Sequence, residues 1–265
     1  MSKLEFFDVN LDEIGKEESI GYENKLKIEK GNTVVRILPP WRNGAQFYKP
    51  FKQHFNLVDL RPFGLEVDNW YSEPCMGEVT VVQDDGVRSV SQPCPVCKIA
   101  NKAFSLGQQT KDPDLINLGK RLRAKRQYVS NVVDPADSNK VKFYVYGKKI
   151  YDDLSTIFGK FGNVTNPQSG RAVTVTKKEI AGQQFNDYSV MPDDKSDISE
   201  LWSKLYSSNL HNLDNFPPYN TYDDVQAKLD GVTLHQGASA VSSTADDDLF
   251  HAPVSNDLGR DPLDA

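Results

Sequence analysis

The sequence lacks a long hydrophobic run, and its longest apolar stretches, such as residues 79–82, cover only a few positions. A membrane-spanning helix needs about 20 consecutive apolar residues, so a transmembrane protein is excluded. The first residues are followed by acidic side chains and not by an apolar signal region. We therefore expect a protein that stays in the cytosol and has no membrane partner.

Cysteine and histidine are scarce, with three and four residues in a chain of 265. In a reducing cytosol disulfides are disfavoured, and thiolates more often bind metal ions. All three cysteines follow His54 closely: Cys75 stands alone, and Cys94 and Cys97 form a Cys-x2-Cys turn. Two thiolates spaced in this way point into the same concavity, and the third cysteine and His54 complete four ligands. The pattern predicts one structural zinc ion (Zn2+) in a small lobe over residues 54–97.

A catalytic zinc site is the alternative, because the Pro-Cys-Pro-Val-Cys segment ending at Cys97 also matches half of the nucleobase deaminase motif. The other half requires a His or Cys followed two residues later by a catalytic Glu. Asn56 follows His54 at that spacing, and Gly77 follows Cys75, so the glutamate is missing. A fourth protein ligand would also fill the position that a reactive water needs. We therefore expect a binding protein and not an enzyme.

Charge is distributed unevenly, although the net charge is only -6. Residues 1–30 carry 5 basic and 8 acidic side chains, residues 31–190 carry 22 and 15, and residues 191–265 carry 4 and 14. Within the basic middle, residues 120–149 alone hold 9 basic and 2 acidic groups. A positive stripe beside an acidic tail indicates a domain that binds a polyanion and a tail that regulates it or recruits partners.

One predicted strand, residues 140–146, combines aromatic and basic side chains. Alternation gives it an apolar core face and an opposite face with Lys142, Tyr144 and Tyr146. Tyrosines that stack bases beside a cation that contacts phosphate are typical of a surface for single-stranded nucleic acid. The alternative is an ordinary solvent-facing strand, because Tyr suits strands well. No segment reads as a major-groove recognition helix, which favours single strands over duplexes.

Hydrophobic spacing and turn residues predict a β-rich α+β chain. Strands are expected at residues 25–28, 33–38, 128–133 and 172–180, and helices at 98–107, 113–122, 150–161 and 198–205. The second helix ends in a basic run, which is either a phosphate-binding surface or a solvated helix face. Residues 1–21 form either a short amphipathic helix or a frayed terminus. From residue 233 the Ser, Ala, Gly and Asp-rich composition predicts disorder.

Taken in order, these motifs resemble a known family, the single-stranded DNA-binding, helix-destabilising proteins of T-even bacteriophages. The resemblance covers about residues 22–190, and the combination is more specific than any single motif. It rests on residues 25–28, 34–39, His54, residues 70–75, the Cys-x2-Cys turn, the basic run ending at Arg126, residues 134–136, 140–141 with Tyr144, 147–152, and Phe185 with Tyr188.

The resemblance implies an OB-fold core with an inserted zinc-binding subdomain, single-stranded DNA in a cleft between them, and an acidic C-terminal tail that contacts replication proteins. We therefore expect an N-terminal segment at 1–21 and a core at 22–190, with the zinc subdomain at 54–97 and helices at 98–126. Helices at 191–231 should pack on the core, and a disordered acidic tail should follow at 232–265. By motif, zinc ligation falls on His54, Cys75, Cys94 and Cys97, and DNA contact falls on the basic run, Tyr144, Phe185 and Tyr188.

The expectation is a sequence-independent protein that coats and protects single strands during phage DNA replication, recombination and repair, in the cytoplasm of the infected bacterial host. Its expected partners are single-stranded DNA, phage replication and recombination proteins bound through the tail, and neighbouring copies of itself along the DNA. The expected DNA contacts are Lys120, Arg121, Arg123, Lys125, Arg126, Tyr128, Lys142, Tyr144, Tyr146, Lys148, Lys149, Phe185 and Tyr188. The alternative is a zinc-ribbon protein-interaction or transcription factor, which would bind single strands only weakly.

Two features depart from the family pattern. Family members have a basic N-terminal segment that drives cooperative binding, whereas residues 1–30 are acidic here. The family also has tyrosines close to its Cys-x2-Cys turn, whereas residues 88–92 and 104–120 contain none. We therefore expect a different basis for any cooperativity and a stacking surface that is smaller or shifted.

Overall fold

The computed structural model describes residues 22–57, 59–60, 65–66, 72–77, 79–83, 86–90, 93–180 and 186–230. The chain forms a mixed α+β fold around one large antiparallel sheet. The strands of this sheet are β1 (Gly31–Ile37), β2 (Lys49–Phe55), β5 (Ser72–Pro74), β8 (Lys125–Asp134), β9 (Asp137–Gly147), β10 (Arg171–Glu179) and β11 (Asn186–Lys195). Two smaller antiparallel pairs are β3 (Asp59–Leu60) with β4 (Leu65–Glu66), and β6 (Val79–Gln83) with β7 (Gly86–Val90).

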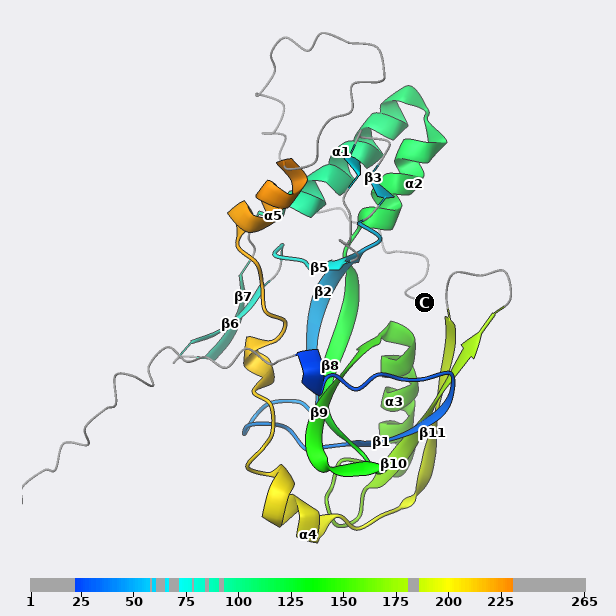
Figure 1. The fold of residues 1–265 in the computed structure, drawn as a ribbon, viewed down its shortest axis with the longest axis vertical. Coiled ribbons are helices and arrows are strands. Elements are labelled where there is room, and N and C mark those ends of the chain that lie inside the picture. Colours follow the sequence, from blue (N-terminus) through cyan, green and yellow to red (C-terminus); the bar gives the residue numbers. More distant parts are fainter. Residues whose placement is uncertain are drawn as a thin grey trace, which may run out of the picture.

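The helices divide between two ends of the molecule. In Figure 1, α1 (Pro95–Thr110), α2 (Pro113–Leu122) and α5 (Tyr222–Asp230) lie at the top, and α3 (Lys148–Phe161) and α4 (Ser199–Leu201) lie in the lower half. α4 continues into a π-helical turn, η3 (Trp202–Tyr206), and the short turns η1 (Tyr22–Asn24) and η4 (Leu213–Asn215) are 3₁₀ helices. No helix in the described part of the chain has the length and apolar character needed to cross a bilayer.

The strand β8 joins the two ends. One of its edges pairs with β9, from Gln127 opposite Gly147 to Val132 opposite Lys142. Its other edge is divided, because β2 pairs with the first half of β8 and β1 with the second half. β2 continues to β5 and the metal-ligand residues, and β1 continues to β10 and β11. A single backbone ladder therefore connects the lobe at the top of Figure 1 with the sheet below it.

Both faces of β9 are buried, so the prediction of a solvent-facing side with Tyr144 and Tyr146 is wrong. Tyr144 and Tyr146 are 6% and 3% exposed, and they belong to the main core, which α3 covers with Ile150 and Leu154. Phe143, on the other face, packs against the C-terminal segment that contains η4. The η4 segment thus covers the Phe143 face and α3 covers the tyrosine face, so both faces of the strand are buried.

The predicted helices after the Cys-x2-Cys turn are present as α1 and α2. The Asp112 carboxylate accepts hydrogen bonds from the backbone N–H groups of Asp114 and Leu115, which caps α2. α1 and α2 cross closely at Gly119, where a Cβ atom would lie 2.7 Å from the Cβ of Phe104. Glycine is therefore required at this crossing, and the two helices form one tight pair.

Helix α5 covers the metal-ligand lobe from the far end of the described chain. Its Val225 and Leu229 are buried in the same apolar cluster as Cys75 and Cys94. The ammonium group of Lys228 lies 3.1 Å from the buried carboxylate of Glu73 on β5. The lobe is thus completed by a segment that lies more than 120 residues away in the sequence.

Other local expectations differ from the structure. Residues 25–28 do not form a strand: Lys25 makes an isolated bridge to Phe143, and the segment then runs irregularly with Leu26 in the core. The expected helix at 198–205 is a short α-helical turn followed by a π-helical one. The tail and the N-terminal segment at 1–21 lie outside the described residues, as does Phe185.

Candidate nucleic-acid interface and metal centre

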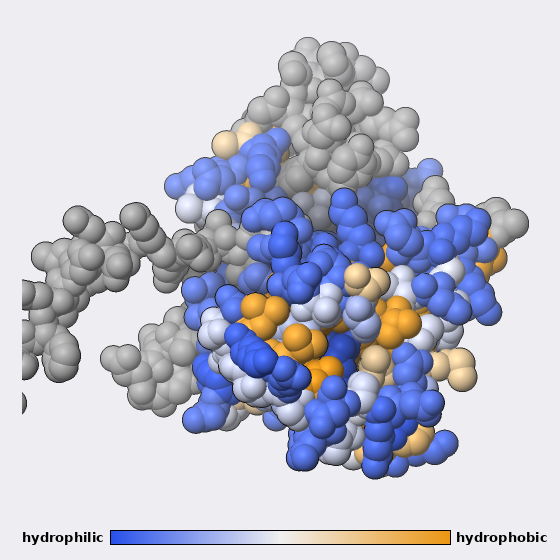
Figure 2. All heavy atoms as spheres, turned by 60° about the horizontal axis from the view of Figure 1, so that its bottom comes forward, coloured by the Kyte–Doolittle hydropathy of each residue, from blue (hydrophilic) through white to orange (hydrophobic). Residues whose placement is uncertain are grey.

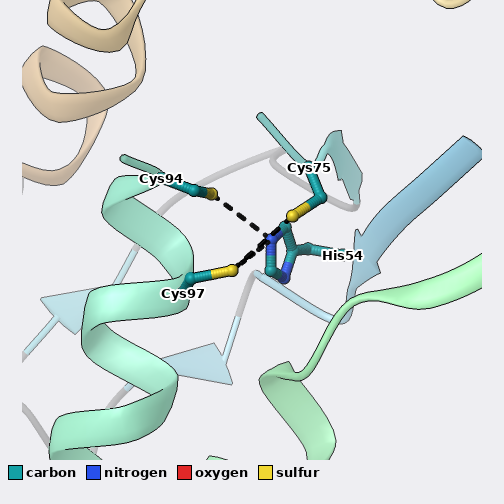
Figure 3. Close-up of side chains that lie close together, drawn as sticks. All are labelled: His54, Cys75, Cys94 and Cys97. Atoms are coloured by element: carbon teal, nitrogen blue, oxygen red, sulfur yellow. Dashed lines mark hydrogen bonds between the residues drawn. The ribbon is translucent and has the colours of Figure 1, made fainter. Parts of the chain in front are cut away.

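The four predicted metal ligands converge in one place. His54 comes from β2, Cys75 follows β5, Cys94 is the N-cap of α1, and Cys97 lies in its first turn. Their ligand atoms all lie within 4.8 Å of one another, and their side chains point toward a common centre (Figure 3). His54, Cys75 and Cys94 are buried, and Cys97 is partly buried. The cluster could hold a metal ion.

The distances within this cluster fit a tetrahedral zinc ion. His54 Nε2 lies 3.5 Å from Cys94 Sγ and 3.6 Å from Cys97 Sγ, and the Sγ atoms of Cys75 and Cys97 are 3.5 Å apart. Ordinary zinc bond lengths place a sulfur and a nitrogen ligand about 3.6 Å apart, and two sulfurs about 3.8 Å apart. Four protein ligands fill all positions of a structural site, which leaves none for a reactive water.

A backbone hydrogen bond on the side away from the cysteines fixes the orientation of the His54 ring. Its Nδ1 lies 2.7 Å from the carbonyl oxygen of Leu122, the last residue of α2. A carbonyl oxygen only accepts hydrogen bonds, so Nδ1 carries a proton, and Nε2 is the nitrogen that faces the cysteines and would bind a metal ion. This arrangement, a ligating histidine that donates its other N–H to the protein, is usual around bound metals.

The electrostatics of the cluster favour a cation. Contacts with Cys75 and Cys94, together with burial, raise the pKa of the Cys97 thiol, because a negative charge on Cys97 would lie next to the sulfur atoms of the other two cysteines. A divalent cation at the centre removes this penalty, since it compensates the charge of the thiolates. The residues therefore fit a metal ion both in geometry and in charge.

A concave surface in the lower half of the molecule encloses a volume of about 520 Å³. It lies between residues 25–29, the end of β9, the start of α3 and the strands β10 and β11. Four lysines line it, together with a single carboxylate, and Tyr144 and Tyr188 contribute aromatic rings. The lysines are Lys25, Lys27, Lys149 and Lys177. Burial, and secondarily the charge of Lys27, lowers the pKa of Lys25. Such a surface suits an anionic ligand with planar groups.

The predicted basic run lies on the path from the metal lobe to this surface. Lys120 and Arg121 end α2, Arg123 is its C-cap, and Lys125 and Arg126 begin β8, one residue before the pocket-lining Gln127. All of them except the half-buried Arg121 are exposed. The structure therefore places the basic run and the concave surface next to each other along one strand.

The predicted stacking tyrosines are largely internal. Tyr128, 5% exposed, stacks on Tyr151 with ring centroids 4.0 Å apart and lies parallel to Tyr146 at 5.9 Å. Burial raises the pKa values of Tyr144 and Tyr146, so both hydroxyl groups stay protonated. Tyr188 is only partly buried and reaches the pocket from β11. It is the most accessible of the predicted aromatic residues within the described chain.

The predicted lysines differ in their surroundings. Lys142 lies 3.0 Å from the carboxylate of Asp137 and 3.9 Å from that of Asp134, at the β8–β9 turn and outside the lining of the concave surface. Lys148 pairs with Asp152 at 2.9 Å within α3. Lys149 lies 3.8 Å from the carboxylate of Asp153 and also lines the concave surface. The structure thus joins Lys149 to the basic region and separates Lys142 from it.

A second concave surface, of about 640 Å³, has the opposite character. Its lining includes Val34, Pro135, Asp193 and Asp194, with Lys195 as its only cation among the described residues. Exposed apolar side chains on this side of the sheet include Val34 and Met191. Figure 2 brings the lower end of the molecule forward and shows hydrophobic side chains gathered within a hydrophilic rim. Two carboxylates make this second surface unsuitable for phosphates.

Sequence reasoning missed three of the lysines that line the basic surface, namely Lys25, Lys27 and Lys177. The Lys-Leu-Lys-Ile alternation of residues 25–28 was a usable signal, because it places two lysines on one side of an extended segment. The lysine pair at residues 177–178 was a weaker signal for the same surface. Their convergence depends on pairing between segments about 150 residues apart, which local spacing does not contain.

The fold and the two sites define a class: an α+β protein with a buried cluster of three cysteines and one histidine that could hold a metal ion, and with a cationic concave surface that suits an anionic ligand. The chain belongs to the gp32-like family of DNA-binding proteins, since the family model described as "gp32 DNA binding protein like" matches residues 29–233. This match confirms the family resemblance found in the sequence and supports a role in binding single-stranded DNA. No curated protein matches the chain.

Proposed function

We propose that the protein binds single-stranded DNA without sequence preference, and that it coats and protects single strands during phage DNA replication, recombination and repair. The observation that carries this proposal is the concave surface with four lysines and Tyr188, in a chain of a DNA-binding family. Lysines neutralise phosphates whatever the base sequence, and an aromatic ring stacks on any base. Neither contact requires a defined nucleotide order.

The proposed path of the DNA runs from the end of α2 along the start of β8 to the concave surface. Phosphates would meet Lys120, Arg121, Arg123, Lys125, Arg126, Lys148 and Lys149, together with the pocket lysines. Bases would stack on Tyr188 and on Phe185, and the buried Tyr128, Tyr144 and Tyr146 would form the floor. The sharing of β8 by three strands supports an OB-type core, a fold that binds single strands on its sheet.

We infer that the ion held by the four ligands is one structural zinc. Three thiolates and one imidazole in tetrahedral spacing are the usual zinc donor set, whereas carboxylate and water sites suit magnesium or calcium. When bound, the ion would supply folding energy and no chemistry. The ligands would hold β2, β5 and α1 together and so fix the upper wall of the DNA path.

The acidic C-terminal tail, residues 232–265, is proposed as the contact with replication and recombination proteins in the cytoplasm of the infected host. It contains the Asp246-Asp247-Asp248-Leu249-Phe250 segment, in which acidic residues precede an apolar pair. Such a segment suits binding to a basic, partly apolar surface of a partner. A neighbouring copy along the DNA is the other partner that we propose.

The test is a titration of labelled oligo-dT at rising salt, read by fluorescence anisotropy. Binding should weaken steeply, with a slope of about -0.7 in log–log form for every phosphate neutralised on a single strand. Lys27→Gln and Lys149→Gln should each make the slope shallower by about 0.7. Lys195→Gln, on the second concave surface, is the matched control and should leave the slope unchanged. An affinity for oligo-dT that does not respond to salt would contradict the proposed function.

A protein-interaction or transcription factor is the second candidate, and the exposed apolar side chains of Val34 and Met191 favour it. Met191 is 65% exposed and lies on the same face of the sheet as Val34, one strand beyond Thr174, so the two side chains contribute to an apolar surface that a partner would cover. This candidate predicts weak binding to oligo-dT and no difference between the lysine variants. The same titration therefore separates the two functions.

A further inference from the structure

Arg123 and Phe104 form a stacked pair on the helical hairpin beside the metal centre. The guanidinium carbon of Arg123 lies 4.7 Å from the centre of the Phe104 ring. Arg123 is exposed and Phe104 is partly buried, so the ring supports the guanidinium group from below. A guanidinium group held over a ring in this way can present its outer face to a further planar group.

We propose that Arg123 and Phe104 form a base-stacking subsite for single-stranded DNA, with one nucleobase lying on the outer face of the guanidinium group. This inference rests on the proposed function and adds a place for a base that the sequence did not indicate. Arginine planes and aromatic rings both stack on nucleobases, and they do so without regard to sequence.

The surroundings of the pair favour a nucleic-acid ligand. Lys120, Lys125 and Arg126 lie within three positions of Arg123, and no acidic residue occurs between Asp114 and Asp134. Phosphates on either side of a stacked base would therefore meet cations. A similar pair elsewhere lacks this setting: Arg171 lies 4.2 Å from the centre of the Phe161 ring, but it donates to the backbone of Asp193, near two carboxylates.

The subsite is held in place from both sides. Phe104 is fixed by the close crossing of α1 at Gly119 of α2. The backbone immediately before Arg123 is fixed because the carbonyl oxygen of Leu122 accepts the hydrogen bond from His54. A stacking group that is already ordered loses little conformational entropy when its ligand binds.

The position of the subsite fits the proposed DNA path. Three residues lie between Arg123 and Gln127 at the edge of the basic concave surface, and the four backbone steps span at most about 14 Å in an extended strand. A single strand that occupies the concave surface would therefore reach Arg123 within a few nucleotides. The subsite extends the proposed interface and does not duplicate the tyrosines below it.

The experiment compares two ligands that differ only in their bases: oligo-dT and an abasic oligonucleotide with the same number of phosphates. Arg123→Lys keeps the charge but removes the planar group, and Phe104→Leu keeps the bulk but removes the ring. Each variant should bind oligo-dT about 5-fold or more weakly, which is the low end of the contribution of one stacked base. Affinity for the abasic ligand should change less than 2-fold, and the salt slope should stay the same.

Arg171→Lys is the matched control and should leave both affinities unchanged, since its pair lies beside carboxylates. Arg123 is exposed, so Arg123→Lys keeps the inference testable even if Phe104→Leu fails to fold. Equal losses on the two ligands, or no loss on either, would overturn the subsite while leaving DNA binding intact. If the unmodified protein does not bind oligo-dT at all, the proposed function itself fails, and the two failures are therefore distinguishable.

Discussion

Lys49, on β2, is a buried lysine whose surroundings link stability to pH. Its side chain donates a hydrogen bond of 2.5 Å to the carbonyl oxygen of Asp214, and the residue is 5% exposed. Burial lowers its pKa to about 8, with the neighbouring Arg42 acting in the same direction and Asp214 opposing it. The unfolded chain holds this proton up to about pH 10.4, an ordinary lysine value. Between these two values the unfolded state binds more protons, so stability should rise with pH.

We expect Lys49→Met to remove this dependence. Relative to that variant, the free energy of unfolding of the unmodified protein should increase by about 3 kcal/mol between pH 7.5 and pH 10.5. Urea unfolding at several pH values measures the difference directly. Lys204→Met, at an exposed lysine, is the control, and its free energy of unfolding should change with pH in the same way as that of the unmodified protein. Parallel curves for Lys49→Met as well would show that Lys49 stays charged in the folded state.

At the scale of the element, the helices α1 and α2 both depend on the metal ligands. α1 starts at Cys94 and Cys97, and α2 ends at the carbonyl group that His54 holds. α5 then packs on the same cluster. The three helices of the upper lobe should therefore lose their order together when the ion is removed.

We expect a strong chelator to reduce the helical signal in far-UV circular dichroism and to release one equivalent of zinc. Metal binding contributes about 10–16 kcal/mol to the folding of isolated zinc peptides, so loss of the ion should unfold the helices that pack around it. Added zinc should restore the signal, and added magnesium should not. His54→Ala should lack the bound ion, whereas His235→Ala, outside the ligand set, should retain it. An unchanged spectrum after complete loss of the metal would contradict this role.

Short-range spacing accounts for the parts of the structure that the sequence could predict. The Cys-x2-Cys turn and the two helices that follow it are each encoded within a few residues, and all are present. Tyr144 and Tyr146 are buried because α3 and the strands β10 and β11 pack on their face of β9, so alternation alone wrongly left them exposed. The lysines of the concave surface also depend on pairing between distant segments, and the Arg123–Phe104 pair depends on how the consecutive helices α1 and α2 pack.

At the scale of the whole molecule, charge is separated between a basic core and acidic ends. Residues 31–190 have 22 basic and 15 acidic side chains, whereas residues 191–265 have 4 and 14. An acidic segment joined to a basic binding surface competes with DNA at a high effective concentration. The tail is therefore expected to weaken DNA binding in addition to recruiting partners.

Truncation after Gly231 should raise the apparent affinity for oligo-dT, most clearly at low salt, because the competition is electrostatic. A full-length variant with the acidic residues of the tail changed to Asn or Gln should behave like the truncated chain. Anisotropy titrations at two salt concentrations provide the measurement. If only the truncation raises the affinity, the tail acts through its bulk and not through its charge.

β8 also fixes the distance between the metal lobe and the basic concave surface. It begins between Arg123 and Gln127 and pairs along both edges, so the interval between the metal lobe and the concave surface is counted in backbone steps. One residue inserted there would shift the pairing and turn every following side chain to the opposite face. The turn at Pro135 and Ala136 carries no such constraint, because it lies beyond both sites. Length variation among related chains should therefore accumulate at that turn and be absent from residues 123–127.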